Sequence, residues 1–212
     1  VELIESHGNE KQKEYYLPKH ISGKWTGTMN LTEPHAGSDL SSIKTKAIEK
    51  DEKFLIKGTK IYITHGDQDM SDNIIHLVLA KLPNAPEGVK GISLFLVPKY
   101  YLNDKGTKVK NDIKVVSVEH KLGHHASPTC VLSFGENEGA IGELVGEPNQ
   151  GLKAMFTMMN NARLNVGVQG LAISERAYQK ALSFSKERIQ GYSLNKNVTG
   201  PVAVSYTHLT LP

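Results

Sequence analysis

Hydrophobic and polar positions follow two different periods along the chain, and the period changes near residue 150. Before that point, short runs rich in β-branched residues are separated by Gly, Pro, Asn and Asp, which is typical of strands joined by turns. These runs are KTKAIEK, FLIKGTKIYIT, IIHLVLAKL, ISLFLVPK, IKVVSVEHK, CVLSFG and AIGELVG. The pattern predicts an all-β domain from Ile21 to about Gly146, built as a sandwich or a barrel, with a turn at Asp51-Glu52.

From Gly151 onward, apolar residues recur every three or four positions, which is the period of a helix. The pattern predicts a single helix that reaches Arg188 and is about 55 Å long, at about 1.5 Å per residue. A lone helix cannot bury such a face, so we expect it to pack against further helices and neighbouring subunits. Its apolar face is formed by Leu152, Met155, Phe156, Met159, Ala162, Val166, Gly170, Ile173, Ala177, Ala181 and Phe184.

The two ends of the chain differ from the regions beside them. The N-terminal residues are charged and aromatic, and Pro18 in EYYLPKH predicts the end of a helix. The chain opens with Val inside an amphipathic pattern, so we expect the true N-terminus to lie upstream. Residues 204–212 have no caps and no period, and they resemble the in-frame translation of a sequencing adapter. The alternative for these residues is a genuine polar tail.

Together these patterns predict an α+β, multi-domain organisation. Residues 1–20 are expected to be the remnant of a helical domain, and residues 21–150 to be the middle β-domain. Residues 151–203 are expected to begin a second helical domain, and residues 204–212 to be non-native.

Composition narrows the class of protein. With 39% hydrophobic and 22% charged residues, and no apolar run near eighteen residues long, the chain is expected to be a globular protein with no membrane span. A net charge of +3 over 212 residues is too small and too scattered to indicate a nucleic-acid partner, but it suits an anionic small molecule. The single cysteine, Cys130, excludes an internal disulfide and indicates a reducing compartment, the cytoplasm.

Two short segments carry candidate chemistry. In MNLTEPHAGSDLSS, Pro34 and Gly37 set a bend, and N–H groups from Ala36 to Asp39 could surround an anionic or carbonyl oxygen. The alternative is a plain turn in which Asp39 caps a helix or forms an Asx turn. In KGTKIYITHGD, Tyr62 and Thr64 are two apart and therefore share one face of a strand. An aromatic ring beside a hydroxyl suits a planar ligand with a hydrogen-bonding edge.

These segments also carry a family resemblance. TEPHAGSD, KIYITHGD, GISLFLVPK, EHKLGHHASPTC and NARLNVGVQGLAISERAYQKALSFSKERIQG, in this order and spacing, resemble the acyl-CoA dehydrogenases, which are FAD-dependent flavoproteins. The resemblance covers about residues 3–200. It implies the middle β-domain and the first long helix of the C-terminal domain, in a protein that forms homodimers or homotetramers.

The resemblance assigns roles residue by residue. It implies that Arg188 reaches the FAD pyrophosphate of a neighbouring subunit, although a solvated arginine favoured by the helix dipole explains that position equally well. It implies that Ser38 contacts the flavin phosphates or the CoA part of the substrate, and that Asn160 and Arg163 bind CoA. The residues implied to contact FAD are Met29, Leu31, Thr32, Ser38, Tyr62, Ile63, Thr64 and Arg188.

Several positions depart from the usual family pattern. His35 stands where most members have Gly, Tyr62 where they have Trp, and His65 where they have Asn. The stretch ERIQG is one residue shorter than usual. Within the family, NLTEPHAGSD, HGDQDMSDNIIHLVLA, GISLFLVPK and MFTMMNNARLNVGVQG are most similar to the branch that contains 3-methylmercaptopropionyl-CoA dehydrogenases, bacterial enzymes of dimethylsulfoniopropionate breakdown.

The reaction that the resemblance implies is α,β-dehydrogenation of an acyl-CoA thioester. A carboxylate removes the α-proton, FAD accepts the β-hydrogen, and an electron-transfer flavoprotein is the expected electron acceptor. A minority of members place the base at the position of Ala162, which cannot abstract a proton, so no catalytic residue is expected in this chain. The alternative is a flavin-containing binding or damage-response protein of the same superfamily, which would need a basic groove.

A cluster of histidines suggests a second chemistry, a metal site. His120 and His124 are four apart and follow Glu119, and His125 is adjacent. Gly123 argues against the helix that would align these side chains, and no further ligand is suitably spaced. We therefore expect no metal.

Overall fold

The computed structural model describes residues 1–103, 105–193, 196–197 and 199–203. The chain divides into two compact units, Val1–Met158 and Met159–Pro212. The sequence-based domain boundaries therefore stay a prediction, and the segment 204–212, expected to be non-native, lies outside the described residues.

Two short helices, α1 (Glu2–His7) and α2 (Glu10–Ile21), open the first unit. Asn9 caps α2, because its side chain accepts from the N–H of Gln12 at 2.9 Å while the Gln12 side chain accepts from the N–H of Asn9 at 3.1 Å. The prediction that Pro18 ends this helix is wrong. The helix continues to Ile21, and the Pro18 carbonyl accepts from the N–H of Ser22 at 3.1 Å. A proline in the last turn removes only one helical bond, which the packing of the helix tolerates.

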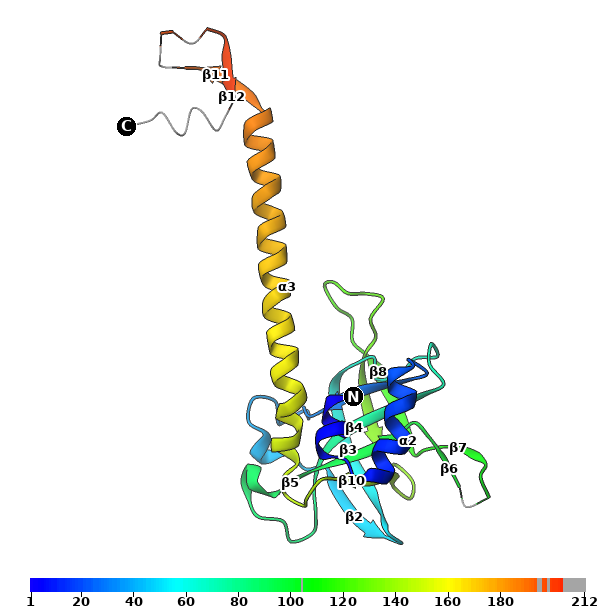
Figure 1. Ribbon diagram of the computed structural model, residues 1–212. Coiled ribbons are helices and arrows are strands. Elements are labelled where there is room, and N and C mark those ends of the chain that lie inside the picture. The colour runs from blue at the N-terminus through cyan, green and yellow to red at the C-terminus, as the bar shows by residue number, and fades with distance from the viewer. Residues whose placement is uncertain (104, 194–195, 198, 204–212) are drawn as a thin grey trace. The chain divides into compact units, whose positions relative to one another are not determined.

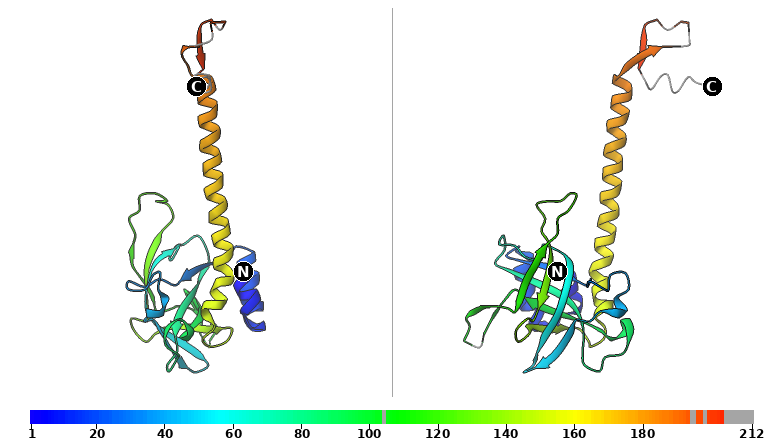
Figure 2. Two further views of the ribbon diagram at one scale, coloured as in Figure 1. Left: turned by 90° about the vertical axis from the view of Figure 1, so that its left-hand side faces the viewer. Right: turned by 180° about the vertical axis from the view of Figure 1, so that it is seen from behind.

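The main sheet confirms the barrel predicted from the sequence. Neighbouring strands are hydrogen-bonded in the order β1-β4-β5-β10-β3-β9-β8, and β2 pairs antiparallel with β3 and parallel with β4. Because β2 joins these two strands, the sheet closes on itself (Figures 1 and 2). The strands are β1 (Trp25–Asn30), β2 (Lys46–Lys50), β3 (Lys53–Thr64), β4 (Asn73–Lys81), β5 (Ile92–Pro98), β8 (Ile113–Val118), β9 (Thr129–Phe134) and β10 (Ala140–Val145).

The predicted turn between β2 and β3 is also confirmed. Asp51 and Glu52 have φ angles of 50° and 61°, and they join the paired residues Lys50 and Lys53. Positive φ at both central residues defines the tight type I′ turn, whose twist matches that of the flanking strands.

The barrel is filled by apolar side chains from most of its strands, and β4 and β5 are buried along nearly their whole length. The first turn of α3 (Gly151–Glu187) packs against β5, because a Cβ built on Gly151 would lie 2.4 Å from the backbone nitrogen of Leu94. The core comprises Ala47, Ile56, Ile63, Val78, Ala80, Phe95, Val97, Cys130, Leu132, Phe134 and Ala140.

The sequence did not predict the shorter elements of the first unit. A two-stranded hairpin, β6 (Tyr100–Leu102) and β7 (Lys108–Lys110), extends from the barrel. Two 3₁₀ turns, η1 (Leu40–Ser42) and η2 (Gly88–Gly91), lie in loops. These segments are too short to show a clear period.

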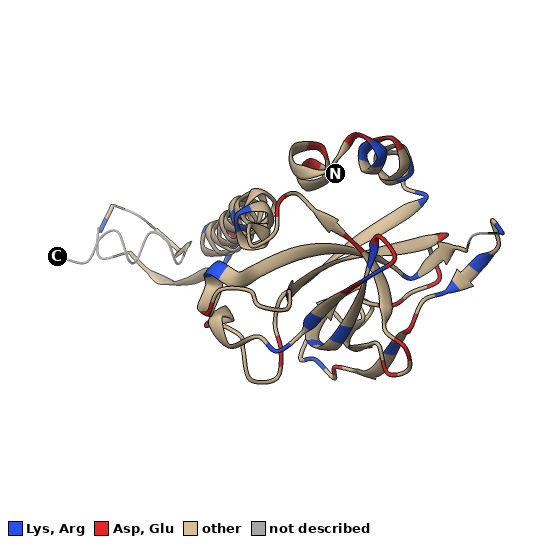
Figure 3. Cartoon of the chain, turned by 90° about the horizontal axis from the view of Figure 1, so that it is seen from below, with Lys and Arg blue, Asp and Glu red and all other residues tan. Residues whose placement is uncertain are grey.

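The second unit contains most of α3 and a short hairpin. The helix spans 37 residues and ends one residue before the predicted Arg188. The strands β11 (Ile189–Tyr192) and β12 (Pro201–Ala203) follow it and were not predicted. Within the described part of the chain, no helix is both long and apolar enough to cross a membrane. Figure 3 shows basic and acidic residues interspersed along the chain.

Candidate functional site

The end of β3 lies beside the segment that follows β1. The N–H of Ile61 donates to the carbonyl oxygen of Thr32 at 2.9 Å. The ammonium of Lys60 donates to the carbonyl oxygen of Leu31 at 3.0 Å. The two segments that the sequence marked as candidates, 28 residues apart if counted from Thr32 to Lys60 in the chain, are therefore joined by direct hydrogen bonds.

A bulge in β3 turns candidate side chains outward. The pairing of β3 with β9 shifts register between Lys60 and Ile63, and Tyr62 has a φ of 60°, which is unusual for an aromatic residue. Ile63 is buried in the core, whereas the Tyr62 side chain is 61% exposed and Thr64 is also exposed. Tyr62 and Thr64 thus share the outer face, as the spacing predicts, while Ile63 supports that face from inside.

Met29 occupies the same kind of position on β1. Its neighbours Thr28 and Asn30 are buried in the barrel, but Met29 is 38% exposed. Leu31 and Thr32 follow it and are partly buried. We define the shelf as the residues Met29, Leu31, Thr32, Tyr62 and Thr64.

The shelf has the chemistry needed by a planar, mostly apolar ligand with a polar edge. It combines an exposed aromatic ring and thioether with two threonine hydroxyls, on a backbone held by hydrogen bonds. These residues fit an isoalloxazine ring. Two cavities in the first unit, one beside α2 and one beside the β2–β3 turn, are lined by other residues. Within the first unit the shelf is therefore an open surface.

The loop after the shelf is a tight turn. Glu33 and Ala36 exchange backbone hydrogen bonds of 2.8 and 3.0 Å, so the prediction of a free N–H at Ala36 is wrong. Asp39 caps η1, since its carboxylate accepts from the N–H and hydroxyl of Ser41 at 2.9 and 2.8 Å, which holds the pKa of Asp39 below its usual range. This outcome matches the plain-turn interpretation for Asp39. Ser38 lies between them, exposed.

Sequence reasoning missed the buried charges beneath the shelf. The ammonium of Lys60 and the carboxylate of Glu33 lie 2.9 Å apart, with 0% and 2% of their side chains exposed. Burial lowers the pKa of Lys60 to about 8, against the opposing effect of Glu33. Burial also opposes ionisation of Glu33, but Lys60 and the hydroxyl of Thr45 together lower its pKa. The available signal was strand parity, because Ile56 and Lys60 point to the same inner face.

Two of the positions that depart from the family pattern have local partners. The Nε2 of His35 lies 3.4 Å from the Glu33 carboxylate and 3.1 Å from the carbonyl oxygen of Ser42, and so it closes the turn. His65 has a φ of 52°, and its N–H donates to the carbonyl oxygen of Pro128 at 2.7 Å. His65 therefore joins the end of β3 to the loop between β8 and β9.

The remaining candidates lie in the second unit. The guanidinium of Arg163 donates to the side-chain oxygen of Asn160 at 3.3 Å, so the predicted pairing one helical turn apart is present. Arg188 directly follows α3, and its guanidinium lies 5.8 Å from the centre of the Phe184 ring. The structure describes these residues within their own unit and does not bring them to the shelf, so their implied roles stay predictions.

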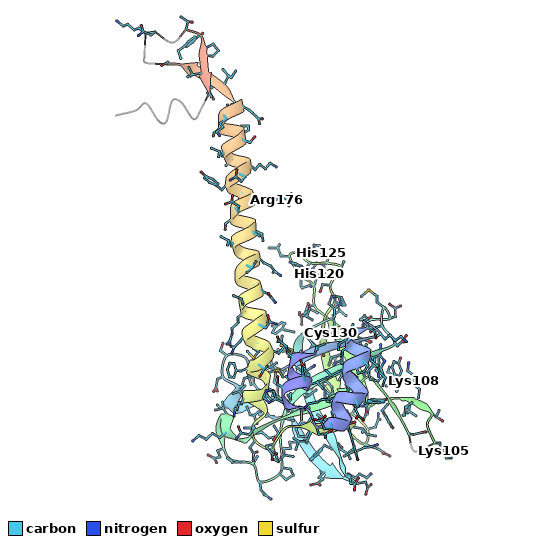
Figure 4. The ribbon with its side chains drawn as sticks, viewed as in Figure 1. Lys105, Lys108, His120, His125, Cys130 and Arg176 are labelled. Atoms are coloured by element: carbon cyan, nitrogen blue, oxygen red, sulfur yellow. The ribbon has the colours of Figure 1, made fainter. Side chains whose placement is uncertain are left out.

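The histidine cluster lies in the loop between β8 and β9. His120, His124 and His125 are exposed, and no helix aligns them. Figure 4 shows His120 and His125 in the part of this loop that extends from the barrel. Among the described residues, no group of three His, Cys, Asp or Glu side chains is arranged to hold a metal ion.

A closed barrel with an open aromatic shelf defines a cofactor-binding domain that would hold one side of a planar ring. The model of the acyl-CoA dehydrogenase middle domain matches residues 28–136, which include every residue of the shelf. The chain belongs to the acyl-CoA dehydrogenase family. Members of this family are FAD flavoproteins.

Individual relatives agree with this assignment. The chain is 50% identical to 3-methylmercaptopropionyl-CoA dehydrogenase of Ruegeria pomeroyi over 96% of its own length and 34% of that protein. It is 44% identical to a butyryl-CoA dehydrogenase of Syntrophomonas wolfei, over 89% of the chain and 32% of that protein. The solved butyryl-CoA dehydrogenase of Megasphaera elsdenii superposes with a TM-score of 0.69 at 30% identity, over 92% of this chain and 48% of that one. The chain thus spans about a third of the length of these curated relatives.

Proposed function

We propose that the protein is an FAD-dependent acyl-CoA dehydrogenase that introduces an α,β double bond into an acyl-CoA thioester. The observation that carries this proposal is the family match over residues 28–136, because both segments of the shelf fall inside it. When bound, FAD supplies the two-electron redox chemistry. The chain's own residues bind and orient it.

Each shelf residue has a distinct role in this proposal. The ring of Tyr62 and the side chain of Met29 provide the apolar surface for the flavin, and Ile63 supports that surface from the core. Thr32 and Thr64 offer hydroxyls to the polar edges, and Leu31 completes the shelf. Ser38, on the exposed turn, is assigned to the phosphates of FAD or the CoA part of the substrate.

The second unit supplies the cationic contacts. Asn160 and Arg163 are assigned to the CoA moiety, and their mutual hydrogen bond would hold the guanidinium ready for it. Arg188 is assigned to the FAD pyrophosphate of a neighbouring subunit, which requires a homodimer or homotetramer. A guanidinium suits phosphate oxygens because its donors form a planar fork.

The catalytic base is proposed to lie outside these 212 residues. Ala162 occupies the only position on α3 where the resemblance allows a base, and its methyl group cannot accept a proton. The 212-residue chain by itself should therefore show no desaturase activity with any acyl-CoA. Turnover by this purified chain would contradict the assignment of the base.

For the substrate we propose 3-methylmercaptopropionyl-CoA, which places the protein in dimethylsulfoniopropionate breakdown. The support is the 50% identity to the Ruegeria pomeroyi enzyme, compared with 44% to a butyryl-CoA dehydrogenase. The test is kcat/KM of the full-length protein for this thioester, compared with butanoyl-, octanoyl- and palmitoyl-CoA. The highest value for the sulfur-containing thioester supports the proposal, whereas a preference for a straight chain restricts the assignment to the family.

The expected partner is an electron-transfer flavoprotein, and the expected compartment is the cytoplasm. Reoxidation of the reduced protein by a purified electron-transfer flavoprotein tests the first, and cell fractionation tests the second. The alternative of a nucleic-acid-binding relative gains no support from Figure 3, where charges of both signs are mixed. The described residues therefore favour the dehydrogenase.

A further inference from the structure

The carboxylate of Glu33 is a hub beneath the shelf. One oxygen accepts from the ammonium of Lys60 at 2.9 Å and from the N–H of Thr45 at 3.1 Å, and the Thr45 hydroxyl donates to it as well. The other oxygen accepts from the N–H of Lys44 at 2.7 Å and lies 3.4 Å from the Nε2 of His35. One side chain thus holds both ends of the loop that runs from residue 33 to residue 45.

Lys60 links this hub to the shelf. Its ammonium bonds Glu33 and also donates to the carbonyl oxygen of Leu31 at 3.0 Å. The next residue, Ile61, donates its N–H to the carbonyl oxygen of Thr32, and Tyr62 follows in the bulge. The pair therefore fixes the Leu31–Thr32 segment against the residue that carries the aromatic ring.

Stability alone does not explain a buried ion pair at this position. Removing two charges from water costs several kcal/mol per ion, and a well-packed apolar pair of similar volume is often at least as stable. Lysine is rarely buried completely, yet Lys60 is 0% exposed. An apolar residue here could not hold the carbonyl of Leu31 or satisfy the N–H groups of Lys44 and Thr45. What the pair adds is a defined geometry.

We propose that Glu33 and Lys60 are positioning residues that preform the shelf before the flavin binds. Neither side chain needs to touch the ligand, because both act through the backbone of Leu31 and Thr32 and through the bulge at Tyr62. The inference rests on the proposed function in naming FAD as the ligand. Its first test does not depend on FAD.

The first test is amide hydrogen exchange in the full-length protein without FAD. The N–H groups of Lys44, Thr45 and Ile61 should be protected at least 100-fold relative to the exposed loop amide of Ala126. Adding FAD should increase that protection only slightly. Exchange of these three amides at the rate of Ala126, with protection appearing only when FAD binds, would overturn the proposal, because the ligand would then be organising the loop.

The second test separates positioning from stability. Glu33→Gln leaves the ammonium of Lys60 buried without its counter-charge, so a large drop in melting temperature is expected. The double variant Glu33→Gln/Lys60→Met removes both charges and should recover most of that loss. It should still bind FAD at least tenfold more weakly than the wild type and show a shifted visible flavin spectrum. Recovery of melting temperature, affinity and spectrum together would show a purely structural role.

Two controls complete the second test. Lys114→Met breaks an exposed ion pair, Lys114 with Glu136 at 3.1 Å, and should change neither affinity nor spectrum. Val97→Ala lowers stability by trimming the core of the barrel and should leave the flavin spectrum as in the wild type. If the wild type binds no FAD at all, the proposed function fails, and hydrogen exchange still decides whether the pair preforms the shelf.

Discussion

The N–H of Ile61 lies 2.9 Å from the carbonyl oxygen of Thr32, and this bond makes one surface from two distant parts of the chain. Thr32 ends the segment after β1, and Ile61 precedes the bulge that carries Tyr62. Neither segment forms a ligand surface by itself. The position of the candidate flavin site thus follows from how β1 and β3 meet in the barrel.

Tyr62 is predicted to exchange stability for binding. Its φ of 60° is unfavourable for any residue with a side chain, by about 1 kcal/mol. Tyr62→Gly should therefore raise the free energy of unfolding of the FAD-free protein by up to about 1 kcal/mol, while it weakens FAD binding at least tenfold. Urea denaturation and flavin titration measure the two effects.

A matched control for Tyr62 is Glu52→Gly. Glu52 has nearly the same φ, 61°, but lies in the turn between β2 and β3. It should give a similar gain in stability with unchanged FAD affinity. Unchanged affinity in Tyr62→Gly would show that the ring does not contribute to the shelf.

The start of α3 is predicted to tolerate no side chain at Gly151. A Cβ there would lie 2.3 Å from the carbonyl carbon of Ser93 and 2.4 Å from the nitrogen of Leu94. Gly151→Ala must push the helix away from β5, so we expect a loss of about 1–3 kcal/mol in the unfolding free energy. Thermal or urea unfolding of the 212-residue chain measures it.

Gly167→Ala is the control for this substitution, because a Cβ at Gly167 would have no heavy atom from outside its own stretch of helix within 4 Å. In the same chain it should raise helix stability by about 0.8–1 kcal/mol. Equal effects of the two substitutions would contradict the close contact between α3 and β5.

The buried His76 predicts a loss of stability in acid. Burial lowers the pKa of His76 to about 3, with smaller opposing effects of Asp67, which raises it, and Lys99, which lowers it. The Nδ1 of His76 lies 2.7 Å from the hydroxyl of Thr28. Between its ordinary pKa of 6.5 and about 3, the unfolded chain binds a proton that the folded chain does not. The contribution is therefore absent above pH 6.5 and destabilises the fold by up to about 1.4 kcal/mol per pH unit below it.

His76→Gln should flatten the pH dependence of stability between pH 6.5 and about 4, because glutamine does not titrate. His120→Gln, in the exposed loop, should leave the dependence as in the wild type. Urea unfolding at a series of pH values measures both. An unchanged slope in His76→Gln would assign the acid sensitivity to other groups.

The sequence predicts the long and strongly periodic elements well, and the structure shows why. The barrel strands and α3 have clear periods, and Asp51-Glu52 carries turn chemistry, so local pattern and fold agree. Pro18 misled the prediction because its cost in the last turn of α2 is small beside the packing of that helix. β6, β7, β11 and β12 were missed because three or four residues cannot establish a period.

The candidate site was only partly predictable. The exposed face shared by Tyr62 and Thr64 follows from strand alternation, even though a bulge intervenes. The pair formed by Glu33 and Lys60 depends on contact between segments 27 residues apart, which no local pattern encodes. The relation between the shelf and Arg163 or Arg188 stays a prediction, since those residues belong to the second unit.

The most direct test of the dehydrogenase assignment is the response of the bound flavin to a thioester. The full-length protein should purify with FAD, and 3-methylmercaptopropionyl-CoA added without oxygen should bleach the visible flavin band. The corresponding free acid should leave the band unchanged, because the thioester is needed to acidify the α-proton. A bound flavin that none of the acyl-CoA thioesters reduces would contradict the account and favour a flavin-containing binding protein.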